Sequence, residues 1–355
     1  MANVLGIDVG YGHTKWVATS SDGGDTKKGI FPSVAPVTLK ERTAEAAGMS
    51  GLRTVTVRVG DQNYVVGRDA YHETEAYFAR SLLPDYSKTD GYHALMLGAL
   101  SLSGLREIDQ LVIGLPLTTL ATHHAALSEK YLGEHAIGAS YARRKVDVLV
   151  RHVNVTSQPA GAMLHAVAVK PELRKSKNLV IDIGYFTMDF LMCEGLRPFY
   201  KRSGAIHGGM SAFYDRLSSV VADKFKTDGI PNHGSIDHFR LEEALAQSQS
   251  DGMGSRFSIQ AGKREVDITD CVAIARPKLT EHLDRMVSTL GSESLGVIST
   301  IVLAGGGAKV MLPSVQAMLG DSFEITTLPN SQFAIASGYA QLGQASVRRA
   351  PALTE

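Results

Sequence analysis

The chain has 355 residues, of which 44% are hydrophobic and 20% charged, a composition typical of soluble globular enzymes. Lys and Arg together number 36 and so do Asp and Glu, so the formal net charge is zero and no basic surplus favours direct binding of nucleic acid. The length exceeds what one compact core usually supports, which predicts two domains.

The cysteines and the N-terminus bear on the cellular compartment. Cys193 and Cys271 lie in apolar stretches far apart in the sequence, which favours two free buried thiols in a reducing environment over a disulfide. The chain opens on a strand pattern rather than on the basic and apolar segments of a secretory signal. No run approaches the roughly 20 apolar residues of a membrane span. We therefore expect a cytoplasmic protein without membrane contact.

The first predicted element is a hairpin, and its turn carries a motif that returns halfway along the chain. Residues 7–11 read IDVGY and residues 181–185 read IDIGY, each after an apolar run and before a second run rich in β-formers. This pattern predicts a buried strand, a tight turn and a returning strand, with Asp8 and Asp182 at the strand ends. Either stretch alone would suggest an ordinary hairpin with a solvent-facing aspartate. The repetition favours a duplicated fold.

Between the two motifs, residues 30–88 have the pattern of a small inserted subdomain with short strands and a polar loop at 40–51. Beyond it, helical and strand patterns alternate, which predicts an α/β fold. The expected elements are a helix over 91–103, a strand over 110–117, a helix over 121–132, a strand over 145–150, and a helix up to 169 with Pro159 in its first turn.

After the second motif the alternation continues. The expected elements are helices over 210–225 and 239–247, a polar loop over 249–255, one amphipathic helix over 267–290 with a kink or boundary at Pro277, a strand over 300–304 and a closing helix over 330–342.

Three glycine-bearing loops each follow an apolar strand, at residues 8–15, 182–189 and 303–309. Backbone N–H groups of such turns can cradle phosphate oxygens, and a glycine-rich helix N-terminus favours anions. Carboxylates of Asp8 and Asp182 on facing hairpins can hold a hydrated cation. Lys15 adds a positive charge beside the phosphates, although a solvated strand lysine is the alternative.

Other site patterns are absent or weak. Gly262-Lys263 does not complete the phosphate-binding motif G-x-x-x-x-G-K-[ST], because Phe257 occupies the position of the first glycine. The sequence also has no G-x-G-x-x-G motif at the start of a predicted helix. His233 and His238 lack a zinc spacing, which makes them loop histidines. His123 and His124 are expected on a solvated helix face, and residues 263–265 in an exposed turn.

The order of the loops resembles the actin, sugar kinase and heat-shock chaperone ATPase superfamily. Residues 8–15 are similar to its phosphate-1 motif, including Lys15 as in actins, residues 182–189 resemble phosphate-2, and residues 301–309 resemble the adenosine motif. VTSQPAGA at 155–162 and the helix near 330–342 are similar to its two connecting helices. Phrases such as FPSV at 31–34, YVVGRDA at 64–70 and GLPL at 114–117 further resemble the plasmid-segregation actins of the ParM/StbA family, including protein D of the PRTRC plasmid system.

This resemblance implies two actin-like (ribonuclease H-like) domains that face each other across a nucleotide cleft, each with a small inserted subdomain. The division would be 1–155 with an insertion at about 30–88, 156–330 with an insertion at about 211–290, and a returning helix and tail over 331–355. It implies ATP and Mg²⁺ as cofactors. The implied metal-binding residues are Asp8 and Asp182, and the implied catalytic residues are Gln158, which orients water, and Asp182.

The resemblance also distributes the nucleotide contacts over the three loops. The implied phosphate-binding residues are Gly10, Tyr11, Gly12, His13, Lys15, Gly184, Tyr185, Phe186 and Thr187, and the nucleoside-binding residues are Gly305, Gly306, Gly307 and Lys309. Side chains that contact adenine are not evident, with 240–243 the only candidate segment. One departure is Asp189, which stands where actins carry a histidine.

The function implied is an ATPase that polymerises into filaments with ATP and segregates plasmid DNA through a DNA-binding adaptor protein, without binding nucleic acid directly. A sugar-type kinase on the same fold is the first alternative, although no acceptor-pocket pattern accompanies Asp189 or Asp215. A chaperone-like nucleotide switch is the second, although only a short stretch, 344–355, follows the last predicted helix. Filaments on addition of ATP would favour the first function, and phosphate transfer to a sugar would favour the kinase.

Overall fold

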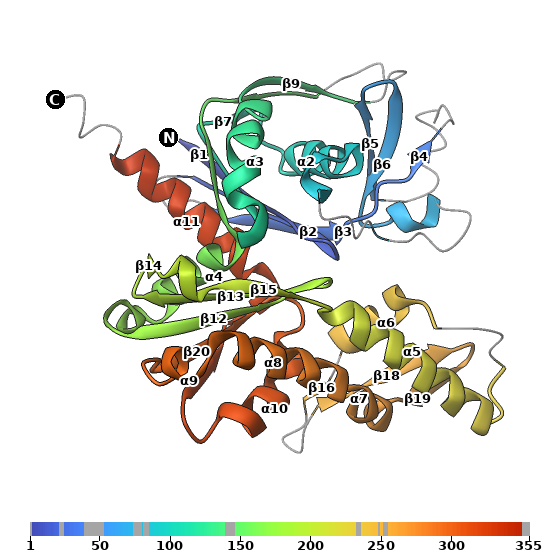
Figure 1. Cartoon of the computed structure of the whole chain (residues 1–355). Helices are drawn as coiled ribbons and strands as arrows, with labels where there is room; N and C mark the ends of the chain where they lie inside the picture. Colours follow the sequence, from blue (N-terminus) through green and yellow to red (C-terminus); the bar gives the residue numbers. More distant parts are fainter. Residues whose placement is uncertain are drawn as a thin grey trace.

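The computed structural model describes residues 2–20, 25–38, 53–73, 80, 85–138, 146–231, 236–247, 249–250 and 255–349. These residues form two α/β domains, one drawn above the other in Figure 1. The N-terminal part of the chain and its C-terminal helix make the first domain, and the residues between them make the second. No helix in the described parts of the chain is long and apolar enough to cross a membrane.

A five-stranded sheet with the order β11-β8-β1-β2-β3 forms the centre of the first domain. Its strands are β1 (Asn3–Val9), β2 (His13–Ser20), β3 (Lys27–Pro32), β8 (Gln110–Leu115) and β11 (Val153–Ser157). β1 runs antiparallel to β2 and parallel to β8, which is in turn parallel to β11. Residues of β1 and β8 are almost all buried, as expected for continuous apolar runs in a sheet covered on both faces.

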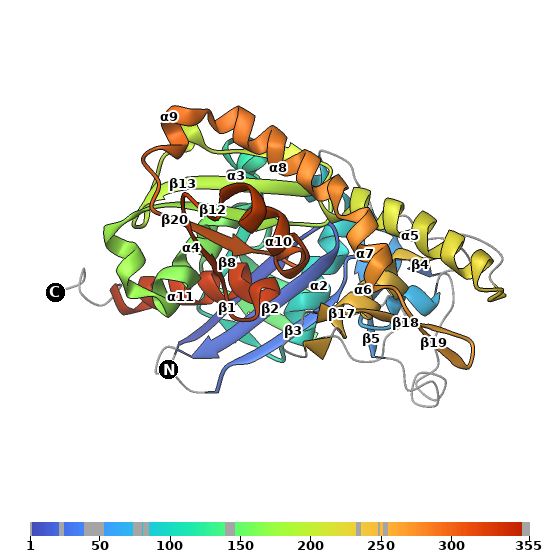
Figure 2. The same ribbon diagram turned by 90° about the horizontal axis from the view of Figure 1, so that it is seen from below.

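The second domain repeats this arrangement. β12 runs antiparallel to β13 and parallel to β20, which is parallel to β21. Figure 2 shows β13, β12 and β20 side by side. The strands of this sheet are β12 (Lys177–Ile183), β13 (Thr187–Glu194), β14 (Arg197–Pro198), β15 (Gly204–His207), β20 (Thr300–Ala304) and β21 (Glu324–Thr327). The shared pairing order confirms the predicted α/β fold and its duplication.

Two helices link the domains. α4 (Gln158–Val169) leads from β11 into the second domain, and α11 (Ala334–Arg349) returns to pack on β1 (Figure 1). They cross at two glycines: a Cβ on Gly338 would lie only 1.8 Å from the carbonyl oxygen of Gly161. Because no side chain separates the two backbones there, the domains are joined by a closely packed helix crossing.

Smaller elements extend each domain. The first carries a three-stranded sheet, β4-β6-β5, made of β4 (Val37–Thr38), β5 (Thr54–Val59) and β6 (Gln62–Gly67). The second carries helices and hairpins around Phe213, Leu217 and Leu241, which are fully buried. Those elements are α5 (Met210–Thr227), α6 (His238–Ala246), β16 (Gln249–Ser250), β17 (Ser255–Arg256), β18 (Ser258–Ala261), β19 (Arg264–Asp267) and α7 (Thr269–Ala275).

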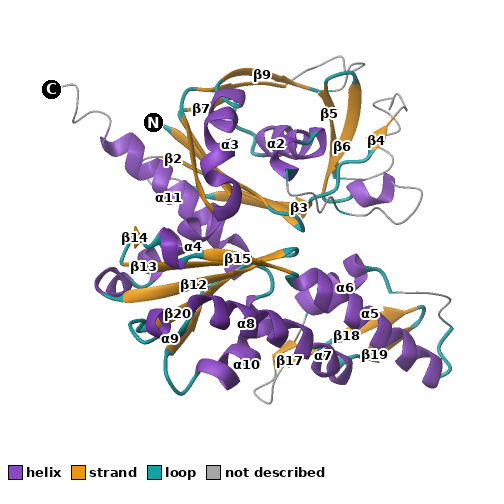
Figure 3. Cartoon of the chain, in the orientation of Figure 1, coloured by secondary structure: helices purple, strands orange, loops and turns teal. Residues whose placement is uncertain are grey.

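Helices flank both sheets, as the secondary-structure colours of Figure 3 show. Those not yet given are α2 (Asp90–Leu102), α3 (Leu117–Lys130), α8 (Pro277–Leu290), α9 (Ser292–Leu295), α10 (Ala308–Leu319) and the short η1 (Ala70–Glu73), η2 (Tyr86–Lys88), η3 (Pro171–Lys175), η4 (Tyr200–Arg202) and η5 (Ser331–Phe333). The remaining strands are β7 (Glu107–Ile108), β9 (Gly133–Ile137) and β10 (Val146–Val150).

Several predicted element ends are wrong. The helix expected over 267–290 is two helices, because Pro277 cannot donate a backbone hydrogen bond and instead starts α8. α3 begins directly after Pro116, four positions before the predicted start, and α11 runs from Ala334 to Arg349 instead of over 330–342. The polar stretch at 249–255 includes strand residues, and the turn near 263–265 gives way to β19 at Arg264. The loop expected at 40–51 lies outside the described residues.

Candidate functional site

The two motif turns have the same backbone geometry. The Gly10 N–H donates to the carbonyl of His13 over 3.2 Å, and the Gly184 N–H donates to the carbonyl of Thr187 over 3.0 Å. In the first hairpin Asp8 pairs across the strands with Lys15, and at the equivalent place in the second hairpin Asp182 pairs with Asp189. The duplicated hairpins therefore differ in charge: one holds an opposite-charge pair and the other a like-charge pair.

The turns approach each other between the domains. A Cβ on Gly12 would lie 2.8 Å from the Cβ of Tyr185, so only glycine permits this contact between the first loop and the second. Ser33, the residue directly after β3, holds the first loop in place. Its hydroxyl donates to the Gly10 carbonyl over 2.6 Å and its N–H to the Gly12 carbonyl over 2.9 Å. The loops predicted to bind phosphate therefore lie together on opposite walls of one interdomain site.

Three carboxyl groups lie in this site, and all are buried. Asp8, Asp182 and Asp189 have 1%, 6% and 1% of their surface exposed. The Lys15 ammonium donates to Asp8 Oδ2 over 3.0 Å. Burial, and then the charges of Asp189 and Asp8, raise the pKa of Asp182 to about 8. Burial also raises the pKa of Asp189 to about 6, although the Thr187 hydroxyl, which donates to its Oδ2 over 2.7 Å, opposes this shift.

Gln158 reaches the same cluster from the first residue of α4. Its Nε2 donates to Asp8 Oδ1 over 3.0 Å, in a buried hydrogen bond. The side chain is directed there because β11 ends at Ser157 and α4 begins at the next residue, with Pro159 in its first turn. Since the amide nitrogen is held by Asp8, the amide oxygen remains to accept a hydrogen bond.

The third glycine loop joins β20 to α10 and is thus the strand-to-helix junction that the sequence predicts. It is hydrogen-bonded to the second hairpin. The Gly307 N–H donates to the carbonyl of Ile183 over 3.1 Å, and the Gly305 N–H to that of Ser331 over 3.1 Å. Gly306 and Lys309 are exposed. Gly305 has φ +85°, and a Cβ on it would lie 2.4 Å from Asp182 Oδ1. The would-be Cβ would also lie 2.5 Å from the Ile183 carbonyl oxygen, so a side chain at this position clashes with both the Asp182 carboxyl and the backbone of the second hairpin.

We expect Gly305→Ala to lower the free energy of unfolding by about 1–3 kcal/mol, because it adds a steric clash to a left-handed backbone. Gly291→Ala is the matched control: Gly291 has φ +72°, but no atom lies within 4 Å of its would-be Cβ, so only the backbone strain applies. Chemical denaturation of both variants measures the difference. Equal losses would show that the Asp182 contact does not constrain residue 305.

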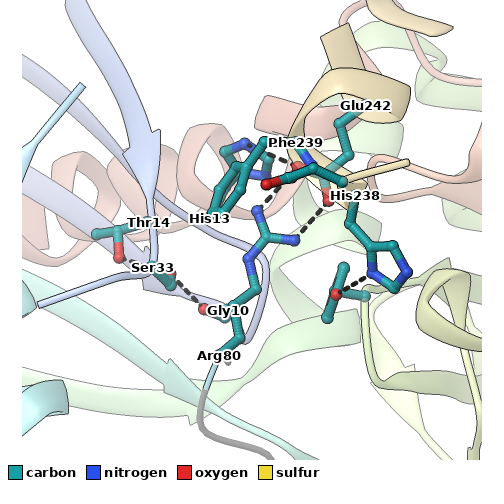
Figure 4. Close-up of polar contacts among 10 residues, drawn as sticks. Gly10, His13, Thr14, Ser33, Arg80, His238, Phe239 and Glu242 are labelled. Atoms are coloured by element: carbon teal, nitrogen blue, oxygen red, sulfur yellow. Dashed lines mark hydrogen bonds and ion pairs between the residues drawn. The ribbon is translucent and has the colours of Figure 1, made fainter. Parts of the chain in front are cut away.

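An ion pair that the sequence does not reveal crosses between the domains at this site. Arg80 donates to both carboxylate oxygens of Glu242 on α6, over 2.6 and 2.8 Å, and its side chain is only 3% exposed (Figure 4). Its guanidinium lies 4.2 Å from the ring centre of Tyr185 and 4.4 Å from that of Phe239. Burial alone would lower the pKa of Arg80, but the hydrogen bonds and charge of Glu242 outweigh it and raise that pKa.

His13 and His238 lie around this pair. His13 Nε2 is 3.7 Å from Glu242 Oε2, and the dense packing around the imidazole lowers its pKa to about 4, so His13 is neutral at pH 7. His238 Nδ1 is 2.8 Å from the Tyr185 hydroxyl. Both glycine loops that are predicted to bind phosphate therefore contact the Arg80–Glu242 pair. Glu242 belongs to the segment 240–243 considered for adenine contacts, but here its carboxylate is taken by Arg80.

Other predictions can be compared with the structure. Cys193 and Cys271 are free and buried, as expected. The prediction that His123 is solvated is wrong, because His123 is only 6% exposed. Its side chain points from α3 toward η2, where its Nδ1 lies 2.9 Å from the Ser87 hydroxyl. His124 is exposed, and His233 lies outside the described residues. Within the described ranges no three His, Cys, Asp or Glu side chains are grouped to ligate a metal ion directly.

Family models match both halves of the chain. Residues 6–161 match the model described as the N-terminal domain of actin-like proteins. Residues 180–317 match the model described as the C-terminal part of the MreB-like archaeal actin homologue. No protein with a curated description matches the sequence.

Many solved structures share the fold along the whole chain. Ta0583, an archaeal actin homolog in complex with ADP, is 20% identical with a TM-score of 0.68, and the alignment covers 98% of this chain and 100% of that one. ParM from a 15-stranded Clostridium botulinum filament is 18% identical with a TM-score of 0.71, covering 97% and 99%. Bacillus thuringiensis ParM with AMPPNP is 15% identical with a TM-score of 0.66, covering 98% and 99%.

Proposed function

The chain belongs to the actin-like proteins, and from this membership we propose that it is an ATPase that assembles into filaments with ATP and Mg²⁺. The observation that carries the proposal is the meeting of two equivalent hairpins, each with a buried aspartate at the end of its strand and a glycine turn beside it. Structures with the same fold include one with ADP, one with AMPPNP and one in a filament, which supports the nucleotide and the assembly.

The donor set of the site suits Mg²⁺. Three buried carboxyl groups share the site with the ammonium group of Lys15, which binds Asp8, so a divalent cation would offset the remaining negative charge. Mg²⁺ keeps most of its water ligands, so few direct protein ligands are needed. We assign Asp8 and Asp182 to this role, largely through water. When bound, Mg²⁺ would neutralise charge on the β- and γ-phosphates.

The remaining predicted residues have complementary roles in this mechanism. Backbone N–H groups of 10–13 and 184–187 would bind the phosphate oxygens, and Lys15 would stabilise charge that develops in the transition state. Gly305, Gly306, Gly307 and Lys309 would border the nucleoside. Gln158 would orient the attacking water through its amide oxygen, since its nitrogen is held by Asp8. A neutral amide orients water but is a poor base, which is consistent with modest turnover.

The proposed ATP hydrolysis would control the assembly and disassembly of filaments. ATP would draw the two domains together and favour the polymerising state, and hydrolysis would weaken it, a population shift set by the γ-phosphate. Plasmid DNA is the cargo we propose, reached through a DNA-binding adaptor protein. The absence of net positive charge supports an adaptor over direct contact with DNA.

We expect Gln158→Ala to slow ATP hydrolysis by about 10²-fold because the orientation of water is lost. The substitution also removes the hydrogen bond to Asp8, but Asp8 keeps Lys15 as a partner, so ATP affinity and ATP-dependent assembly should stay near wild type. Filaments of the variant should therefore persist longer after ATP is added. Gln110→Ala removes a similarly buried amide outside the site and is the control. Phosphate release, nucleotide titration and pelleting measure the three properties. An equal loss of all three would contradict this role for Gln158.

A further inference from the structure

A small pocket lies beside the first phosphate loop, on the first-domain side. Val9, Tyr11, Tyr92, Pro116, Thr119 and Gln158 are among its lining residues, and its volume is about 20 Å³. A single water molecule needs roughly 10–15 Å³ measured in this way. The pocket therefore has room for one water molecule next to Gln158.

Tyr92 brings an unpartnered polar group to this pocket. Its side chain is 2% exposed, and its hydroxyl has no hydrogen-bond partner in the protein. A buried hydroxyl without a partner costs about 1–3 kcal/mol, so nearly all such groups bind protein atoms or ordered water. The Tyr86 ring packs edge-on against Tyr92 at 5.4 Å between centroids and stacks on Tyr11 at 4.9 Å, which holds the phenol in place. The hydroxyl is thus fixed without a partner beside a water-sized space.

The pocket also connects Tyr92 to the predicted chemistry. Gln158 lines it, and the amide of Gln158 is oriented by the hydrogen bond from Nε2 to Asp8, so its oxygen is left for another donor. A water that donates to this oxygen and accepts from the Tyr92 hydroxyl would complete the hydrogen bonding of both side chains. Among the side chains that line the pocket, Tyr92 is the one whose buried hydroxyl is left without a partner in the described parts of the chain.

We propose that one water molecule is bound in this pocket by the Tyr92 hydroxyl and the Gln158 amide oxygen, and that it is the water that attacks ATP. The second part rests on the proposed function. The water oxygen forms a bond to the γ-phosphorus, the bond from that phosphorus to the β–γ bridging oxygen breaks with its electron pair going to ADP, and the proton of the water passes to an oxygen of the released phosphate. Tyr92 is a positioning residue. Burial raises its pKa far above neutral pH, so it keeps its proton and does not act as a base.

Tyr92→Phe removes the hydroxyl and keeps the ring. We expect kcat for ATP hydrolysis to fall about 10-fold, the value of one hydrogen bond to water of about 1.4 kcal/mol, with KM and ATP-dependent assembly unchanged. Tyr131→Phe is the matched control, because Tyr131 is equally buried in the same domain but its hydroxyl lies 3.1 Å from His93 Nδ1, outside the pocket lining. Thr119→Ile, which adds bulk at the pocket wall, should reproduce the loss in kcat.

High-resolution crystal structures of the nucleotide-free wild type and Tyr92→Phe give a readout independent of activity. We expect a water within hydrogen-bond distance of the Tyr92 hydroxyl in the wild type and none at that place in the variant. An empty wild-type pocket, or a Tyr92→Phe enzyme that hydrolyses ATP as fast as wild type, would overturn the inference. A wild type that binds the water but hydrolyses no ATP would overturn the proposed function and the attacking role, while the water site itself would stand.

Discussion

Asp182→Asn is expected to lower ATP turnover by about 10²–10³-fold and, at the same time, to raise the melting temperature of the nucleotide-free protein. Turnover falls because the carboxylate proposed to hold the hydrated Mg²⁺ is lost. Stability rises because Asp182 is buried with Asp8 and Asp189, and asparagine keeps its shape without a third acidic group. A gain of about 1 kcal/mol corresponds to roughly 2–4 °C in a domain of this size.

Phosphate release with Mg²⁺ and thermal unfolding without nucleotide measure these opposite effects. Asp321→Asn, at an exposed aspartate of the second domain, should change neither. Chelation of Mg²⁺ in the wild type should reproduce the loss of turnover but not the gain in stability. Unchanged turnover in Asp182→Asn would show that Asp182 has no role in hydrolysis and would contradict the proposed site between the two hairpins.

Reversing either charge of the Arg80–Glu242 pair is expected to accelerate nucleotide release by about 10–100-fold, which corresponds to about 1.4–2.8 kcal/mol. The pair joins the first domain to α6 of the second beside both phosphate loops, so its loss acts on the closed arrangement of the site. Removing one partner of a buried pair leaves the other charge without compensation, which is why the effect should be large.

A fluorescent ATP analogue displaced by excess ATP reports the release rate of Arg80→Glu, Glu242→Arg and the double reversal. The double reversal should recover part of the wild-type rate, because the attraction is restored with opposite polarity while the contacts of the guanidinium with the Tyr185 and Phe239 rings stay lost. Reversals of the exposed Arg151–Glu107 pair, with side chains 48% and 49% exposed, are the control and should have no effect. Release rates that stay at the wild-type value in both single reversals would show that the pair does not restrain the site.

Local patterns in the sequence were sufficient for the duplicated hairpins and their aspartates. The repeated IDxGY turn encodes strand, turn and strand within a few residues, and the parallel partners β8 and β20 are continuous apolar runs. Pro159 predicted the start of α4 directly after a strand, whereas the role of Gln158 was implied only by the resemblance of residues 155–162 to a connecting helix of the actin superfamily. Element ends were less predictable, as at α3, which begins at Leu117 because the Pro116 carbonyl already accepts hydrogen bonds from the backbone N–H groups of Thr119 and Leu120.

The contacts between distant segments were not predictable from local pattern. Arg80 and Glu242 are separated by 162 residues, and neither belongs to a motif. The pairing of Asp182 with Asp189 follows from the hairpin register, but the raised pKa of Asp182 depends on burial that only the assembled domains produce. The strand β9 escaped notice because three of its five residues, Gly133, Glu134 and His135, are poor or polar strand formers.

Electron microscopy of the purified protein with Mg²⁺ and a non-hydrolysable ATP analogue tests the central claim most directly. Nucleotide bound between the two hairpins should produce filaments that persist with the analogue, disassemble after hydrolysis of ATP, and fail to form without nucleotide or with the Asp182→Asn variant. Assembly that is the same with and without nucleotide, or no assembly under any of these conditions, would contradict it.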